Sequence, residues 1–144
     1  MKAALAAWQL WALLAAIFAA LTAILAKLGV EQVNADFATF FRTIVVALVL
    51  AALLTGLGEW QPLGSISPRG LTFLTLSGLA TGASWLCYFR ALKLGNAAQV
   101  APIDKLSVVF VAVFAALFLG EQLTWQAWIG VGLIGSGAIV VALY

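Results

Sequence analysis

Five apolar stretches, each long enough to cross a lipid bilayer as a helix, fill most of this 144-residue chain. A hydrocarbon core about 30 Å thick takes about 20 apolar residues in helical form. Hydrophobic residues make up 65% of the chain and charged residues 8%, too little polar surface for a soluble domain of this size. The sequence therefore predicts an all-α integral membrane bundle of five transmembrane helices, over residues 8–28, 37–57, 71–92, 98–119 and 125–143.

The connections between these stretches are short, which predicts a single transmembrane domain over residues 1–144. The apolar runs do not alternate with polar residues, and this argues against a β-barrel. The first run begins after Lys2 and passes an alanine-rich stretch before Ala23 that resembles a signal-peptide cleavage site. We interpret it as the first membrane helix because the run continues to Leu28 and four more follow. The predicted location is a cell membrane, specifically a bacterial or archaeal cytoplasmic membrane.

An odd number of spans places the two termini on opposite sides, here named side A (N-terminal) and side B (C-terminal). Most tryptophans fall near side A, as in an aromatic girdle. Side A carries Lys2 and Arg69, whereas the lysines and arginines of side B are Lys27, Arg42, Arg90, Lys93 and Lys105. A cytoplasmic side B follows from the positive-inside rule if all of them count. Without the three near or inside the hydrocarbon the count is even, so single and dual topology both stay open.

Asp104 and Lys105 lie about two turns into the fourth stretch, just after Pro102. An ionisable group at that depth costs about 2.5–3.5 kcal/mol on insertion scales, so it needs a partner or a cavity. Adjacent helical residues point about 100° apart, and we therefore expect the two not to pair with each other. We predict a role in substrate binding or ion coupling. The alternatives are an ion pair that fixes helix packing, or a Lys105 side chain that reaches side B.

Two more cations lie towards side B, Arg42 near the start of the second stretch and Lys27 in the last turn of the first. With Lys105 they predict a positively biased vestibule around Asp104, suited to an anionic or zwitterionic solute. For Lys27 we favour a simpler interpretation, a helix-end cation that interacts with the helix dipole and the lipid headgroups.

The third stretch carries a stripe of small polar and aromatic residues at spacings of four, three and four: Ser77, Thr81, Ser84 and Tyr88. Such a stripe could line a solute pathway, and it could equally be an ordinary helix contact. We predict Ser84, its neighbour Trp85, and Tyr88 as substrate-binding residues.

Glycines occur in two patterns that predict close helix packing. Gly78 and Gly82 form a GxxxG pair in the third stretch. The fifth contains GxGxxG at residues 130–135, followed by Ser136 and Gly137. That motif binds dinucleotides only after a strand and a turn, so inside a continuous apolar run it indicates a packing face.

Several classes of chemistry find no support in the sequence. The chain has no histidine, and its single cysteine, Cys87, lies inside an apolar stretch, so we expect no metal and no cofactor. It has no phosphate-binding loop and no Ser–His–Asp set, so we do not expect an enzyme. A net charge of +2 is too small to indicate nucleic acid binding. The expected partners are a small-molecule substrate and membrane lipid.

Several runs resemble the repeat of the EamA family, part of the drug/metabolite transporter superfamily. They are residues 88–95 (YFRALKLG), 97–102 (AAQVAP), 119–121 (LGE) with Gly130, and, in the first half, Lys27 with 40–43 (FFRT). Residues 104–107 (DKLS) resemble the five-helix branch of that family. Typical members have ten helices, built from two five-helix repeats in inverted topology, and this chain matches one repeat. The resemblance implies secondary transport of small metabolites or drugs through a pathway between repeats.

One repeat cannot form that pathway alone, so the resemblance implies a homodimer with the pathway between protomers. An antiparallel dimer reproduces the inversion, and a parallel dimer is the competing arrangement. The alternative function is a membrane scaffold, or a subunit of a larger membrane complex, that moves nothing. The charges of Arg42, Asp104 and Lys105 inside the bilayer favour transport, because a scaffold would not need them there.

Overall fold

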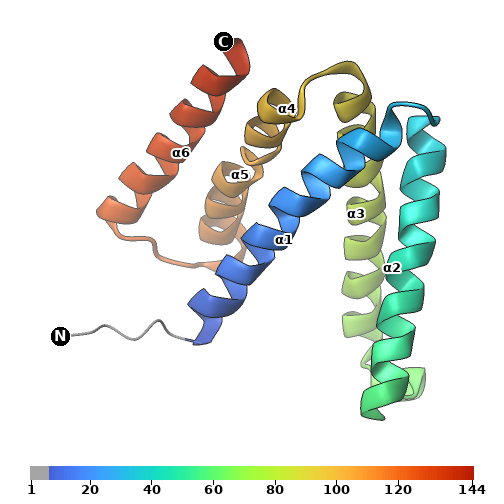
Figure 1. Ribbon diagram of the computed structural model, residues 1–144. Helices are drawn as coiled ribbons and strands as arrows, with labels where there is room; N and C mark the ends of the chain where they lie inside the picture. The colour runs from blue at the N-terminus through green and yellow to red at the C-terminus, as the bar shows by residue number, and fades with distance from the viewer. Residues whose placement is uncertain (1–6) are drawn as a thin grey trace. The chain divides into compact units, whose positions relative to one another are not determined.

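The computed structural model describes residues 7–144, and within that range it contains helices and no strand. Figure 1 shows the long helices α1 (Ala7–Val30), α2 (Ala35–Leu57), α3 (Pro68–Leu94) and α6 (Trp125–Leu143), with the short helices α4 (Ala97–Asp104) and α5 (Ser107–Phe114). A 3₁₀ turn at Leu63–Ser65 precedes α3, and a π-helical turn at Ala115–Leu119 follows α5. By length and composition the helices give five membrane spans, with Ala97–Leu119 as the fourth. The predicted fold class is confirmed.

Local chemistry sets most of the helix ends. The Asn34 side chain accepts hydrogen bonds from the backbone N–H groups of Asp36 and Phe37, which caps α2. At α3, which begins three residues before the predicted span, Pro68 is the first residue and the Ser67 hydroxyl oxygen accepts the N–H of Gly70 at 3.1 Å. The second and fourth spans are followed by glycines with φ of 69° (Gly58) and 68° (Gly120), a conformation that side chains other than glycine rarely adopt.

Contacts between Cα atoms divide the chain into two units, and the first to be described is Leu28–Lys93. Its main feature is an antiparallel hairpin of α2 and α3 (Figure 1). Buried residues gather where α1 ends, α2 begins and α3 ends: Val30, Ala35, Thr39, Phe89 and Leu92. The Thr39 hydroxyl donates to the Ala35 carbonyl, so its polar group is satisfied inside its own helix.

The other unit consists of Met1–Lys27 and Leu94–Tyr144, in which α4 and α5 both contact α6. Its buried residues are small: Ala23, Ala26, Ala112, Ala115, Gly135 and Ala138. Small residues let helix backbones approach closely in lipid, where there is no hydrophobic drive between helices. A Cβ atom added to Gly135 would lie 3.1 Å from the Val109 Cγ2 atom of α5. Gly135 is therefore a true packing position, as predicted for the GxGxxG face.

The fourth span is not the uninterrupted helix that its apolar run indicates. Pro102 lies inside α4, where it has no N–H to donate and its ring crowds the carbonyl four residues earlier, and α4 ends two residues later at Asp104. Across the break the N–H of Lys105 bonds to the Ala101 and Pro102 carbonyls at 3.2 and 3.1 Å, and the N–H of Leu106 bonds to the Ile103 carbonyl at 3.0 Å. The chain tightens to 3₁₀-type bonding there before α5 begins at Ser107.

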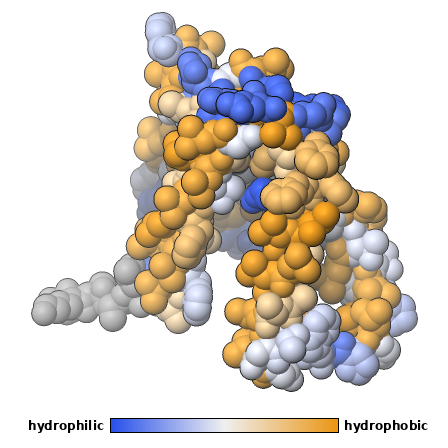
Figure 2. Space-filling model, turned by 45° about the vertical axis from the view of Figure 1, so that its right-hand side comes forward, coloured by the Kyte–Doolittle hydropathy of each residue, from blue (hydrophilic) through white to orange (hydrophobic). Residues whose placement is uncertain are grey.

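The outer surface of the helices suits a lipid environment. Figure 2 shows hydrophobic side chains over most of the visible helix surface, with hydrophilic side chains mainly towards helix ends. Trp8, Trp11, Trp60 and Trp125 are 61–71% exposed, and all four lie in helix turns or connections that the chain order assigns to side A. This exposure fits the predicted aromatic girdle. Lys2, which was counted on the same side, lies outside the described residues.

Candidate functional site

Asp104 and Lys105 lie at the break in the fourth span, and they pair with each other. The Lys105 Nζ atom is 2.9 Å from Asp104 Oδ2, with side chains that are 54% and 35% exposed. The expectation that these neighbours would not pair is wrong. It considered only the directions of the Cβ atoms, whereas the four-carbon stem of lysine is long and flexible enough to turn back. Lys105 also stands just beyond the end of α4, outside the regular helix.

This arrangement combines an ionisable pair with an interrupted membrane helix. Backbone hydrogen bonds bridge the break, for example from the N–H of Val108 to the Lys105 carbonyl at 3.0 Å, so the ionisable side chains are the groups there that a solute or an ion could contact. The pair is not enclosed within the chain, because 35% of the Asp104 side chain is exposed. An Asp–Lys pair is also neutral as a whole, which lowers the cost of placing it inside a span.

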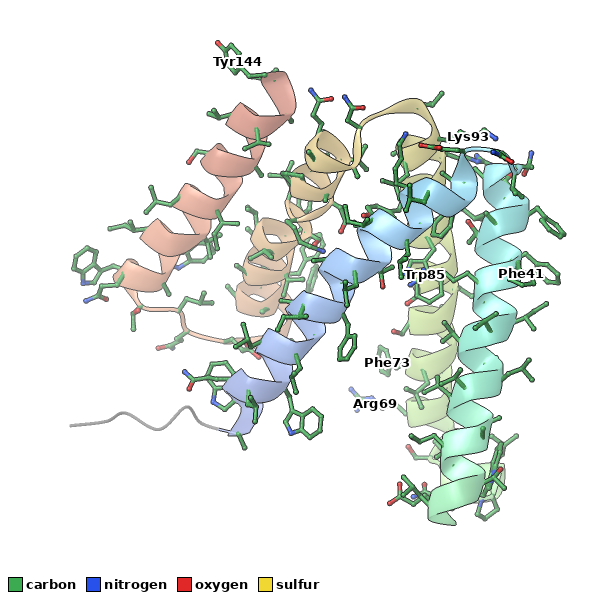
Figure 3. All side chains as sticks on the ribbon, viewed as in Figure 1. Phe41, Arg69, Phe73, Trp85, Lys93 and Tyr144 are labelled. Carbon is green, nitrogen blue, oxygen red and sulfur yellow. The ribbon has the colours of Figure 1, made fainter. Side chains whose placement is uncertain are left out.

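Arg42 forms a second cluster, with aromatic rings of α3. Its guanidinium carbon lies 4.1 Å from the ring centroid of Trp85 and 5.6 Å from that of Phe89. Phe89 packs edge-on against Tyr88, with ring centroids 6.5 Å apart. In Figure 3, Trp85 projects from α3 while Phe41 points outward from α2. Two predicted site residues, Arg42 and Trp85, are thus in contact, and Tyr88 belongs to the same aromatic group.

The aromatic contacts of Arg42 offset only part of the cost of placing this half-buried cation in a membrane span. Arg42 is the eighth residue of α2, about 10 Å along the helix from its start. An arginine at membrane depth costs about 2.5–3.5 kcal/mol on insertion scales, and a cation–π contact returns about 0.5–2 kcal/mol. Ring faces also leave the N–H groups at the edge of the guanidinium without strong acceptors.

The strongest polar contact of the hairpin was not foreseen from the sequence. Arg90 donates from Nε to Asp36 Oδ1 at 2.7 Å and from Nη2 to Asp36 Oδ2 at 2.8 Å, a two-point ion pair between α3 and α2. Lys93 Nζ donates to the Val33 carbonyl in the α1–α2 connection. A signal was present in the sequence: Asp36 lies just before one apolar run and Arg90 just before the end of another. Helix pairing was needed to join them.

Lys27 has a more specific partner than the one expected from its position at a helix end. Its Nζ atom donates to the Gly95 carbonyl at 3.0 Å, just beyond the last residue of α3. A cation at this place satisfies a carbonyl that the helix end leaves exposed. Lys27 therefore takes part in a structural contact, and its predicted role in a vestibule stays a prediction.

The residues of the polar stripe of α3 differ in burial and in hydrogen bonding. The Thr81 hydroxyl donates to the Ser77 carbonyl one turn earlier, which satisfies it within its own helix. Ser84 is exposed and Tyr88 is half-buried. An added Cβ atom would meet nothing within 4 Å at Gly78, Gly82, Gly130, Gly132 or Gly137 in the described chain. These glycines have room for a neighbour, and the partner predicted for them stays a prediction.

The predicted site residues fall into two groups that are each placed by their own unit. Asp104 and Lys105 are joined at the break, while Arg42, Trp85 and Tyr88 gather in the α2–α3 hairpin. The vestibule combines residues of both units and stays a prediction. Between residues 7 and 144, no group of three or more possible ligands could hold a metal ion.

Comparison with known proteins decides the family. Residues 6–143 match the EamA-like transporter family, nearly the whole chain. The chain belongs to the EamA family. EamA transporters are multi-pass membrane proteins, and the five spans agree with that location. The resemblance seen in the sequence is therefore confirmed, and with it a role in transport.

Relatives of this EamA chain are named as transporters. It is 59% identical over 137 residues to an uncharacterized transporter in the cobO 3'region of Sinorhizobium sp., covering 95% of this chain and 97% of the relative. It is 29% identical over 125 residues to the uncharacterized transporter sll0355 of Synechocystis sp., covering 85% of this chain and 37% of that one.

A third relative is the pseudopaline exporter CntI of Pseudomonas aeruginosa, 26% identical over 102 residues, with 71% of this chain and 34% of the exporter covered. This EamA chain thus spans nearly the full length of the first relative and about a third of the other two. No solved structure gives a significant match.

Proposed function

We propose that this EamA chain is a secondary transporter that moves small metabolites or drugs across the cytoplasmic membrane. The observation that carries the proposal is the break in the fourth span, which places the Asp104–Lys105 ion pair beside the end of a half-helix. Transport requires a segment that changes shape and a polar group that responds to a solute or an ion. A broken membrane helix with a partly exposed carboxylate supplies both in one place.

We propose further that two copies of the chain work together, with the pathway between them. The Sinorhizobium relative is covered over 97% of its length by a match to this single repeat, so a transporter-named protein of about one repeat exists. The other two relatives are about three times as long as the matched segment. A homodimer would supply in two chains what those proteins can carry in one.

Purified protein reconstituted in liposomes tests the transport proposal. A ligand screen by thermal shift in detergent supplies the solutes, and flux of each hit is then measured in both directions, since one relative is named an exporter. We expect uptake or release above that of empty liposomes. The Asp104→Asn variant should abolish it, while Gly132→Ala, on a helix position with no neighbour within 4 Å, should retain it.

The opposite outcome has a clear meaning. Well-folded protein that moves none of its ligands in liposomes, yet co-purifies from membranes with a second protein, would favour the scaffold or subunit alternative. Crosslinking in native membranes adds the assembly readout, because a homodimer gives a product of twice the chain mass. A product that contains another protein would point to a larger membrane complex.

A further inference from the structure

In the α2–α3 hairpin Arg90 has a carboxylate partner, whereas Arg42 takes part in no salt bridge with another residue of 7–144. Arg90 is held by Asp36 through two hydrogen bonds, and Lys93 bonds to the Val33 carbonyl. Neither salt bridge among residues 7–144 includes Arg42. The guanidinium instead lies over Trp85, 4.1 Å from the ring centroid. A charge with no counter-charge in a membrane span indicates a binding function.

The position over the Trp85 ring limits how the guanidinium can meet a ligand. A ring over one face fixes the group and leaves the N–H donors at its edge. Those donors form a planar fork that matches the two oxygens of a carboxylate. Because Trp85 and Phe89 already hold the side chain in place, little rotational freedom remains to be lost when an anion binds.

The surroundings also limit the kind of anion. One arginine neutralises one negative charge, and a doubly charged group such as a phosphate monoester would keep a net charge inside the span. The neighbours of the guanidinium are the aromatic rings of Trp85 and Phe89, with Tyr88 beside them. Aromatic and apolar surfaces of this kind bind the organic body of a small ligand.

We propose that the Arg42–Trp85–Phe89 cluster binds the carboxylate of a small organic monoacid, whose apolar body lies against the aromatic rings. This inference rests on the proposed transport function and names the substrate class for it. The solute would be recognised by its single negative charge and its apolar body together. A neutral analogue of the same shape would lose the two-point hydrogen bonding at the Arg42 fork.

Matched pairs of acids and amides test the proposal on the wild-type chain in phosphatidylcholine nanodiscs. The probes are benzoate, phenylacetate and butyrate, each compared with its amide by titration calorimetry. We expect at least one carboxylate to bind about ten-fold or more tightly than its amide, since hydrogen bonds to charged groups are the stronger ones. Equal affinity for acid and amide in all three pairs would overturn the proposal without recourse to any variant.

Variants locate the binding. Arg42→Gln should remove the preference for the acid, and Arg42→Lys should keep part of it, because lysine retains the charge and loses the fork. Arg69→Gln is the matched control: Arg69 also lies over an aromatic ring, 5.8 Å from the Phe73 centroid, but in the first turn of α3 (Figure 3). It should leave the affinity unchanged. An Arg42→Gln variant that folds and still prefers the acid over the amide would rule out Arg42 as the carboxylate site.

Lipid is the other source of an anion at this depth. The titrations are repeated with phosphatidylglycerol in the nanodiscs, and bound lipid is measured by mass spectrometry. An Arg42→Gln variant that loses bound phosphatidylglycerol but keeps its carboxylate affinity would assign Arg42 to lipid and overturn the proposal.

The test also separates the site from the proposed transport function. Carboxylate binding that depends on Arg42, without movement of the same carboxylate through liposomes, would leave the site and remove the transport proposal. Carboxylate flux that is unchanged in every Arg42 variant would support the transport proposal and overturn the Arg42 site.

Discussion

The carboxylate of Asp36 accepts two hydrogen bonds from the guanidinium of Arg90, at 2.7 and 2.8 Å, and so joins the first turn of α2 to the last turns of α3. Both side chains are about half exposed, at 48% and 61%. This ion pair therefore links α2 to α3 at the end of the hairpin. Its strength depends on geometry and on screening by salt more than on burial.

We expect Asp36→Ala and Arg90→Ala each to lower the melting temperature in detergent modestly, with a smaller effect in high salt. The double variant should be less destabilised than the sum of the two single variants, because both remove the same contact. Thermal unfolding of the four proteins measures this. Strictly additive losses of melting temperature would show that the Asp36–Arg90 ion pair contributes nothing to stability.

Asp104 should carry proton coupling. Asp104→Asn keeps the shape of the side chain and removes its charge, so uptake driven by a pH gradient should fall to the level of empty liposomes. Asp36→Asn serves as the control, since Asp36 is a carboxylate bound to Arg90 at the end of a helix. Unchanged proton-driven flux in Asp104→Asn would exclude Asp104 as the coupling group.

Gly135 should tolerate little added volume. A Cβ atom there lies 3.1 Å from Val109 Cγ2, so Gly135→Val forces the contact of α6 with α5 apart, at a cost of about 1–3 kcal/mol. Gly132→Val is the control, because nothing lies within 4 Å of its added Cβ atom and the helix propensities are the same. The comparison is of melting temperatures in one detergent. Equal losses would mean that Gly135 is not a packing position.

Pro102→Ala should make the fourth span more regular. Alanine restores an N–H at residue 102 that can donate to the Ala98 carbonyl, and it removes the steric clash inside α4. We expect the more regular α4 to continue further towards α5. We expect slower flux at unchanged or higher melting temperature, with slower hydrogen exchange of the amides at residues 104–106. Faster exchange at the break would contradict this explanation of why the helix ends there.

The orientation of the chain can be measured with reporters. Matched topology reporters fused after Tyr144 and before Met1 should each be detected on both sides of the membrane if the dimer is antiparallel. The two-against-two count of the loop cations Lys2, Arg69, Arg90 and Lys93 allows this, but a cytoplasmic side B is expected if Lys27, Arg42 and Lys105 also count. A C-terminus found only in the cytoplasm would exclude dual topology.

Much of the fold could be predicted because each membrane helix is determined by its own segment of the sequence. An apolar run must satisfy its own backbone hydrogen bonds, so its length and its flanking glycines and capping residues set where a helix lies. The fifth predicted span, 125–143, agrees with α6 at both ends, and the residues Ser67 and Pro68 are a typical cap and first residue for the start of α3. Pro102 also held the information for the break in the fourth span, although the continuous apolar run concealed it.

The pairing of side chains could not be predicted from the sequence in the same way. The sequence by itself determined that this is a five-span membrane protein of the EamA type and that Asp104, Lys105 and Arg42 are charges inside it. Only the tertiary structure decided that Lys105 turns back to Asp104, that Arg90 holds Asp36, and that Arg42 lies over Trp85. Contacts of the last two kinds join residues more than forty positions apart, and they depend on the register of α2 against α3. Hydrophobicity is a property of each segment alone, and it does not determine the register of α2 against α3.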